Sequence, residues 1–216
     1  MSRRSVRAFK STPVSRETLE TLLERAKWAP SGGNLQPWTV HVMTGAKIEA
    51  LSAKIGRMIK HLPNGTGGDY QIYPDKLAEP YRTRRFECGS ALYNALGIER
   101  SDKARRAEQF AENFRFFGAP VSLFITIDGK MQLGQWSDLG MFIQTFMLLA
   151  TEAGLGTCAQ EAWSVWTKAV GEAISIQDGH MLFCGVAVGY EDKDRLVNQW
   201  RTKRAGLDEF VQWHGW

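Results

Sequence analysis

Residues 136–153 constrain the fold more than any other stretch, because an α-helix built from them has almost no polar face. Apolar side chains lie all round such a helix, at Leu139, Met141, Phe142, Ile143, Phe146, Met147, Leu148, Leu149 and Ala150. A helix that is apolar on every side is buried in a protein core or in a subunit interface. In a chain of 216 residues we favour an interface. Gln144 and Thr145 interrupt the apolar run, which therefore does not predict a membrane span.

The composition is that of a globular protein and argues against several classes of function. Hydrophobic residues make up 44% of the chain and charged residues 23%. The net charge of +4 does not indicate nucleic-acid binding without a clustered basic face, but it suits an anionic cofactor or substrate. The three cysteines are widely spaced and the N-terminus has no apolar run behind it, so we expect a reducing, cytoplasmic compartment. The four histidines lack metal-ligand spacing, so no metal site is expected.

Hydrophobic patterning predicts both helices and strands. Strands are expected over 38–44, 121–127 and 181–189. Helices are expected over 16–28, with Ser15 as N-cap, and over 47–60, 77–99 and 101–117. Residues 61–75 are rich in Gly, Pro, Asn and Tyr, and form either a mobile excursion over a site or a plain surface loop.

The loop over residues 29–38 combines two glycines with three polar side chains, Ser31, Asn34 and Gln36. Amide groups both donate and accept hydrogen bonds, so they suit a polar heterocycle, and glycine lets a flat ligand approach the backbone. Gln36 precedes Pro37, which favours extended backbone at Gln36. The alternative is a long helix-to-strand turn with solvated polar tips, and these residues alone do not decide between the two.

The N-terminus carries a second polar cluster. In an extended segment Arg3, Ser5 and Arg7 point the same way, which makes a clamp for a phosphate or another anion. A frayed basic terminus is the alternative. A second group of cations, Arg201, Lys203 and Arg204, lies in the tail. No Walker loop, dinucleotide-binding GxGxxG, HExxH or GxSxG motif is present.

Together these parts resemble the FMN-dependent nitroreductase family, over essentially the whole chain. The motifs that carry the resemblance are Arg3-Arg4-Ser5-Val6-Arg7, Pro30-Ser31-Gly32-Gly33-Asn34-Leu35-Gln36-Pro37-Trp38, Gly154-Leu155-Gly156-Thr157-Cys158-Ala159-Gln160-Glu161 and Arg201-Thr202-Lys203-Arg204. Each is weak alone, but their order and distances are specific. The tail Arg204-Ala205-Gly206-Leu207-Asp208-Glu209-Phe210 looks like one branch of the family that acts on nitroaromatic acids, although the family usually has proline where Gly206 stands.

The resemblance implies a single α+β domain over 1–216, with a central, mainly antiparallel sheet flanked by helices. It also implies an intertwined homodimer, with FMN between the subunits and the tail 200–216 wrapped around the partner. The cofactor-binding residues that it implies are Arg3, Arg4, Ser5, Arg7, Pro30, Ser31, Gly32, Asn34, Gln36, Gln160, Glu161, Arg201 and Arg204. Among them Arg3, Ser5, Arg201 and Arg204 would bind the phosphate, and Arg7 the ring edge.

The activity implied is reduction of nitroaromatic or quinone-like substrates by a ping-pong mechanism, with NADPH or NADH as electron donor. No side chain stands out as an obligate acid or base, so no catalytic proton donor is named. Two alternatives stay open at this point. One is a flavin-binding protein without turnover, and the other is reductive dehalogenation or flavin fragmentation on the same fold.

Overall fold

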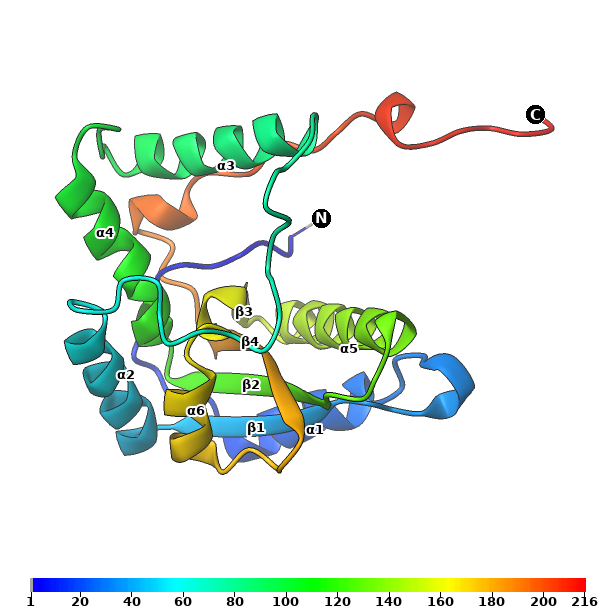
Figure 1. Ribbon diagram of the computed structural model, residues 1–216, viewed down its shortest axis with the longest axis horizontal. Helices are drawn as coiled ribbons and strands as arrows, with labels where there is room; N and C mark the ends of the chain where they lie inside the picture. Colours follow the sequence, from blue (N-terminus) through cyan, green and yellow to red (C-terminus); the bar gives the residue numbers. More distant parts are fainter. Residues whose placement is uncertain (1) are drawn as a thin grey trace.

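The computed structural model describes residues 2–216, and in this range it has a four-stranded sheet with helices on both faces (Figure 1). The strands are β1 (Thr39–Thr44), β2 (Val121–Asp128), β3 (Gly156–Gln160) and β4 (His180–Gly189). Their order in the sheet is β1-β2-β4-β3, and each neighbouring pair is antiparallel. The three predicted strands are confirmed as β1, β2 and β4, while β3 was not predicted.

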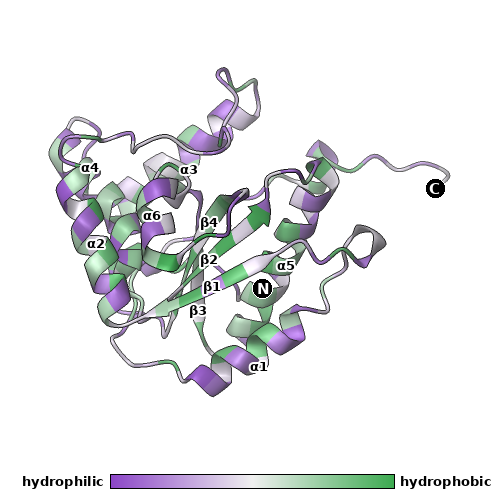
Figure 2. Ribbon diagram, turned by 60° about the horizontal axis from the view of Figure 1, so that its bottom comes forward, coloured by the Kyte–Doolittle hydropathy of each residue, from purple (hydrophilic) through white to green (hydrophobic). Residues whose placement is uncertain are grey.

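The two central strands, β2 and β4, are apolar because both faces of the sheet are covered. In β2, Val121, Leu123 and Ile125 pack with the core on one face, and Phe124 packs with the core on the other. Figure 2 shows hydrophobic residues along these strands. A bulge between Ile125 and Thr126 shifts the register of β2 against β4. The continuous apolar run that predicted a buried strand at 121–127 is thereby confirmed.

The α-helices within residues 2–216 are α1 (Arg16–Ala26), α2 (Ala46–Met58), α3 (Tyr81–Ala95), α4 (Lys103–Ala111), α5 (Leu133–Glu152) and α6 (Thr167–Ile174). Ser15 caps α1 as predicted, since its side chain accepts a hydrogen bond of 3.1 Å from the backbone N–H of Thr18. α3 and α4 are shorter than the helices predicted over 77–99 and 101–117, because the second prediction joins α4 to the 3₁₀ helix Glu112–Gly118.

The sheet separates two hydrophobic clusters. One contains buried side chains of α1 and α5, and the other contains those of α2, α6 and the 3₁₀ helix Glu112–Gly118. By contrast, α3 has no buried residue, and Figure 1 shows it crossing above the sheet and the N-terminal segment. No helix in the described part of the chain is long and apolar enough to span a membrane.

The apolar helix predicted over 136–153 is α5, and one of its sides is only partly covered by residues 2–216. Leu139, Phe142 and Phe146 are buried against the sheet and α1. On the other side Met141 is 38% exposed and Leu148 is 40% exposed. A second chain could cover these side chains, whereas the single chain leaves them in contact with water.

The segment 61–75 is attached to the body at its middle. The backbone N–H of Thr66 donates to the carbonyl of Val165 over 2.9 Å. The Tyr70 hydroxyl donates to the carbonyl of Phe183 in β4 over 2.7 Å. These bonds fix the path of the segment over the sheet, and its mobility stays a prediction.

The C-terminal tail is attached to α3 by an ion pair between Glu209 and Arg84, with 2.8 Å between the charged atoms. After the short 3₁₀ helix Leu207–Glu209 it runs away from the body (Figure 1). It carries large exposed apolar side chains at every third position, at Leu207, Phe210, Trp213 and Trp216.

Candidate active site

Residues 3–7 lie beside the edge strand β3 and extend the sheet by one short contact. The N–H of Val6 donates to the carbonyl of Thr157 over 2.9 Å, and Ser5 pairs with the same residue in a parallel bridge. Val6 is buried over Gly156, where a Cβ atom would come within 2.7 Å of a Val6 methyl group. Glycine at position 156 therefore lets the N-terminal segment approach β3.

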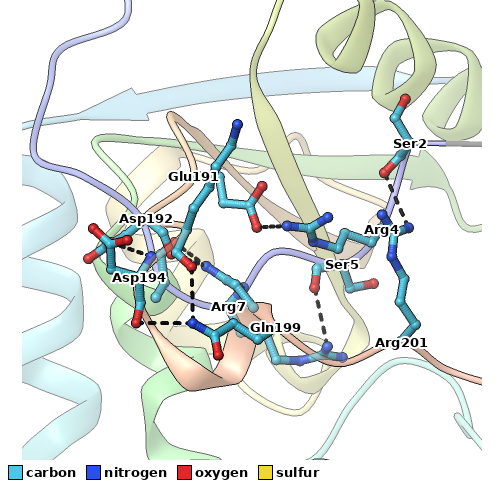
Figure 3. A network of polar contacts seen from close by, with 12 residues as sticks. Ser2, Arg4, Ser5, Arg7, Glu191, Asp192, Asp194, Gln199 and Arg201 are labelled. Atoms are coloured by element: carbon cyan, nitrogen blue, oxygen red, sulfur yellow. Dashed lines mark hydrogen bonds and ion pairs between the residues drawn. The ribbon is translucent and has the colours of Figure 1, made fainter.

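An extended backbone requires the side chains to alternate along this segment. Arg3, Ser5 and Arg7 all act on the buried thiol of Cys158 in β3. Burial raises the pKa of that thiol, while the two guanidinium groups and the Ser5 side chain act in the opposite direction. That the three side chains share one side of the segment stays a prediction. Arg4 points elsewhere and forms an ion pair with Glu191 (Figure 3).

Asn198, which the sequence reasoning missed, joins this segment to the end of the chain. Its side-chain oxygen accepts from the N–H of Arg7 over 2.8 Å, and its amide donates to the carbonyls of Ala8 and Asp192 over 2.9 and 2.8 Å. Asn198 is only 3% exposed, so the bonds are shielded from water. No local sequence signal marks it, because its partners lie up to 191 positions away.

The two ends of the chain meet here. The guanidinium of Arg201 donates to the carbonyl of Ser2 over 3.4 Å (Figure 3). Arg201 therefore lies beside the segment that carries Arg3 and Ser5. Arg204 is exposed in the tail, where its guanidinium donates to Thr202 and to the carbonyl of Lys203. The structure thus brings one of the two predicted tail arginines to the N-terminus and leaves the other apart.

The loop that carries Pro30, Ser31, Gly32, Asn34 and Gln36 is exposed except for the half-buried Ser31. The Ser31 hydroxyl accepts from the backbone N–H of Gln36 over 3.0 Å, and the Gln36 side chain donates to the carbonyl of Asn34 over 3.2 Å. Asn34 and Gln36 have positive φ angles of 57° and 50°. Extended backbone at Gln36 was therefore a wrong prediction. Two strained non-glycine residues held by local bonds are typical of a ligand-binding loop.

A buried carboxylate on α5 holds this loop. Asp138 is 3% exposed, and its Oδ2 accepts from the N–H of Gly32 over 3.2 Å. The carboxylate has no ion-pair partner among residues 2–216. Sequence reasoning missed Asp138, although an acidic residue in an otherwise apolar helix was a usable signal.

Gln160 and Glu161 lie where β3 ends. The side chain of Gln160 is buried and donates to the carbonyl of Asn113 over 2.7 Å, so it is directed toward the 3₁₀ helix Glu112–Gly118. Glu161 begins the next 3₁₀ helix, Glu161–Trp163, and burial raises the pKa of its carboxyl group.

Tyr70 borders Glu161 and links segment 61–75 to the site. Burial, followed by the charge of Glu161, raises the pKa of the Tyr70 phenol. The Tyr70 ring lies 5.2 Å from the ring of Trp136 on α5 and 5.9 Å from that of Phe183 on β4. The end of β3 therefore faces a group of aromatic rings, which suits contact with a planar ligand.

The arginine segment and the polar loop are separate within one chain. Figure 1 shows α5 between residues 3–7 and the loop 30–36. In the described part of the chain, no hydrogen bond joins the two segments.

Comparison with known proteins gives consistent results along the chain. Residues 1–190 match the sequence model of the Nitroreductase family. The chain is 39% identical to a "4-nitrobenzoate reductase" of Pseudomonas putida, over 99% of its own length and 93% of the relative's. It is 36% identical to a "Nitrobenzene nitroreductase" of Ectopseudomonas oleovorans, over 97% and 92% of the two chains.

Solved structures agree with these relatives. An FMN and NADPH-dependent nitroreductase, NfnB, from sphigopyxis sp. strain HMH superposes with a TM-score of 0.96 at 45% identity, over 99% of this chain and 96% of that one. The FMN-dependent NfnB of Mycobacterium smegmatis, solved in complex with NADPH, superposes with a TM-score of 0.92 at 32% identity, over 98% and 94% of the two chains.

Proposed function

The chain belongs to the nitroreductase family, and from this premise we propose that it is an FMN-dependent oxidoreductase that takes electrons from NADPH or NADH and reduces nitroaromatic or quinone-like compounds. The family membership and the antiparallel sheet flanked by helices also confirm the nitroreductase-like α+β fold predicted from the sequence. We further propose that residues 1–216 form a single domain.

The observation that carries the proposal is the meeting of cationic and hydroxyl groups from the two ends of the chain. Arg3 and Ser5 of the extended N-terminal segment both act on the thiol of Cys158, and Arg201 contacts the start of that segment. Guanidinium and hydroxyl groups are donors that match a phosphate, and arginine can bind it with two parallel hydrogen bonds. This donor set fits the phosphate of FMN. We propose that Arg204 joins it when the tail is in place.

The other proposed contacts divide between the strands and the loop. Arg7 would place a positive charge at the N1/O2 edge of the isoalloxazine ring, with Arg4 beside the phosphate through its ion pair with Glu191. Gln160 and Glu161 would lie against one face of the ring. Because the Gln160 side chain is directed toward Asn113, its contact would come from the backbone. The loop contacts would be Pro30, Ser31, Gly32, Asn34 and Gln36.

FMN, when bound, would accept a hydride from the nicotinamide and deliver electrons to the second substrate, which makes the mechanism ping-pong. The protein would contribute orientation and electrostatics. The charge of Arg7 would stabilise negative charge that develops at the ring edge during hydride transfer. The strained loop 30–36, held by Asp138, would keep polar groups fixed against the ring. The aromatic group around Tyr70 would present a flat surface at the end of β3.

We propose that the active species is an intertwined homodimer. The uncovered side chains Met141 and Leu148 on α5 and the apolar side chains of the tail support it. So does the separation of the loop 30–36 from the arginine segment, because a cofactor between two copies would touch both. The tail 200–216 would then wrap around the partner. We also propose a cytoplasmic location, supported by three free thiols in the described part of the chain.

The experiment that tests the function begins with the visible absorption of the purified protein and chromatography of the cofactor released by heat. We expect FMN. NADPH oxidation is then followed with 4-nitrobenzoate and with a quinone, in parallel with NADH. A protein that neither holds nor takes up FMN would refute the proposal. A flavin-containing protein that oxidises no NADPH or NADH with either acceptor would be a flavin-binding protein without turnover.

A further inference from the structure

One proton of the reaction proposed above has no assigned source. Reduction of a nitro group to a nitroso group and water takes two electrons and two protons. A hydride supplies both electrons and one of these protons, so the second proton has to come from another donor. A side chain can deliver it as a general acid when it lies within reach of the reacting atom and its pKa lies near the working pH.

Glu161 lies at the end of β3, where the structure also places the aromatic ring of Tyr70. The charge of Glu161 raises the pKa of the Tyr70 phenol on the segment 61–75 and that of the Cys184 thiol on β4. Its carboxyl group therefore lies within electrostatic reach of both elements. Among residues 2–216, no cation is within ion-pair distance of this carboxyl group, so no positive charge holds it in the ionised form.

The charged groups on the elements packed around this carboxyl group are engaged elsewhere. On the segment 61–75, Asp69 accepts hydrogen bonds from β4 and α6. On the 3₁₀ helix 112–118, Glu112 and Arg115 pair with each other. On β4, the charge of His180 acts on His41 of β1. Burial is accordingly the influence that sets the protonation of the carboxyl group.

The two titratable neighbours of Glu161 are poor proton donors. The Tyr70 hydroxyl already donates to the carbonyl of Phe183 over 2.7 Å, and burial raises the pKa of the phenol. Cys184 is 2% exposed, and burial raises the pKa of its thiol. Groups with raised pKa values of this kind keep their protons at neutral pH, so neither can release one readily.

Glu161 differs from both neighbours because it can release a proton and regain it. Burial of part of its surface raises the pKa of the carboxyl group above 4.5, so its acid form persists to higher pH than in an ordinary glutamate. The residue as a whole stays exposed, which lets water return a proton after each transfer. A general acid needs both properties.

We propose that Glu161 is the proton donor for nitro reduction: its carboxyl group protonates the oxygen that leaves the nitro group. One N–O bond breaks, the nitrogen gains the two electrons of the hydride, and the hydrogen of the hydride and the proton from Glu161 both leave in the water. The carboxylate then takes a proton from solvent. This inference rests on the proposed function, in which Glu161 faces the flavin.

Quinones provide an acceptor that does not need this proton during the reaction. Their reduction breaks no bond to oxygen, and the product can take its second proton from water afterwards. Loss of the acid should therefore separate the two acceptors, whereas a change in the flavin itself would affect both.

The test uses stopped-flow spectroscopy of the flavin-loaded protein, reduced with NADPH and then mixed with 4-nitrobenzoate or with a quinone. In Glu161→Gln, oxidation by 4-nitrobenzoate should slow at least about a hundredfold, while oxidation by the quinone and the preceding reduction by NADPH stay within about threefold. Glu161→Asp keeps an acid that is one methylene shorter and should retain part of the rate. Glu17→Gln, which removes an exposed carboxylate on α1, is the matched control.

Infrared spectroscopy of the flavin-loaded protein supplies a readout that does not depend on turnover. The carbonyl stretch of a protonated carboxyl group should titrate above pH 4.5 in the parent and be missing in Glu161→Gln. In the parent the rate of oxidation by 4-nitrobenzoate should fall as pH rises through the same midpoint, because the acid form is lost. In Glu161→Gln this dependence on pH should disappear.

The possible outcomes separate this inference from the proposed function. Equal slowing of the nitro compound and the quinone in Glu161→Gln would overturn the inference and leave the function in place, as would an unchanged rate with 4-nitrobenzoate. A Glu161 band that titrates below pH 4.5 would also overturn it. A flavin-loaded parent that passes electrons to neither acceptor would refute the function, and the inference with it.

Discussion

At the N-terminal end of the chain, the directions of the side chains follow from the alternation along an extended backbone. Along residues 3–7 this alternation predicts Arg3, Ser5 and Arg7 on one side, while Arg4 pairs with Glu191. An extended segment of this kind places three hydrogen-bond donors on one side without needing a turn or a helix. Backbone hydrogen bonds fix the position of the segment: the N–H of Val6 donates to the carbonyl of Thr157, and the N–H of Arg7 donates to the side chain of Asn198.

The proposed phosphate contacts give a prediction at this scale. Arg201→Ala should weaken FMN binding by about 1.5–3 kcal/mol, the contribution of one hydrogen bond to a charged group. Arg204→Ala should do so as well if the tail closes on the phosphate. Riboflavin, which lacks the phosphate, should bind both variants like the parent. Fluorescence titration of flavin-free protein with the two ligands measures this. Weakening of FMN and riboflavin alike would indicate a general defect and contradict the assignment.

The raised pKa of Glu161 predicts a dependence of stability on pH. Burial disfavours the charged carboxylate, so its pKa in the folded chain lies above the ordinary value of 4.5. Between these two values the folded chain binds more protons than the unfolded chain, and the free energy of unfolding falls as pH rises. Glu161→Gln cannot ionise and should therefore be more stable than the parent above this window, with the difference vanishing below about pH 4.

Urea unfolding of the flavin-free protein at several pH values checks the Glu161 prediction. Glu17→Gln, an exposed substitution in the first turn of α1, serves as the control. A stability difference between Glu161→Gln and the parent that stays constant with pH would show that the effect is packing and not ionisation.

At the scale of elements, the loop 30–36 depends on α5. The buried carboxylate of Asp138 accepts a hydrogen bond from the N–H of Gly32. In the loop that this bond holds, Asn34 and Gln36 have positive φ angles. Asp138→Ala should release the loop and weaken FMN binding by about 1–3 kcal/mol, the cost of a lost partner to a charged acceptor. Ser137→Ala, its exposed neighbour on α5, should leave the affinity unchanged. Equal FMN affinities for the Asp138 variant and the parent would mean that the loop does not line the flavin.

The elements that sequence could predict are those whose pattern is local. α5, β2 and β4 carry long apolar runs, and α1 has its cap at Ser15, so their residues alone define them. β3 is short and contains Gly156, Thr157 and Gln160, and it exists as a strand because β4 pairs with it. The 3₁₀ helix Glu112–Gly118 follows α4 without a break in the periodic pattern, so the two read as one helix.

The same reasoning applies to the site. The arginine segment and the polar loop could be found because each concentrates donors within a few residues. Asn198 and Tyr70 could not be assigned, since each works through a partner far along the chain, whereas Asp138 carried a signal as an acidic residue in an apolar helix, although its partner Gly32 could not be predicted. In the proposed homodimer the flavin contacts would come from two copies of the chain, and the apolar pattern of residues 136–153 predicts an interface without specifying which residues of the second copy would meet the flavin.

For the whole molecule, the exposed apolar side chains of residues 2–216 include those on one side of α5 and four on the tail. Leu207, Phe210, Trp213 and Trp216 are between 64% and 99% exposed, although burial of each would contribute about 1.5–3 kcal/mol. While these side chains stay in water, their apolar surface contributes no free energy to folding or to association. These four side chains lie on a tail directed away from the body, where a groove on another subunit would cover them (Figure 1).

Replacement of these four side chains by serine therefore tests the dimer and the flavin site together. The full-length variant keeps Arg201 and Arg204, so the proposed phosphate contacts remain. We expect the dimer to dissociate at concentrations where the parent stays dimeric, because about 6–12 kcal/mol of apolar burial is removed, and FMN to be lost with it. Light scattering and the visible spectrum measure the two effects. Gln212→Ala with His214→Ala, both exposed in the same tail, is the control and should remain dimeric and yellow. A serine variant that stays a flavin-loaded dimer would show that the tail does not wrap the partner, and a parent that is a flavin-loaded monomer would contradict the dimer itself.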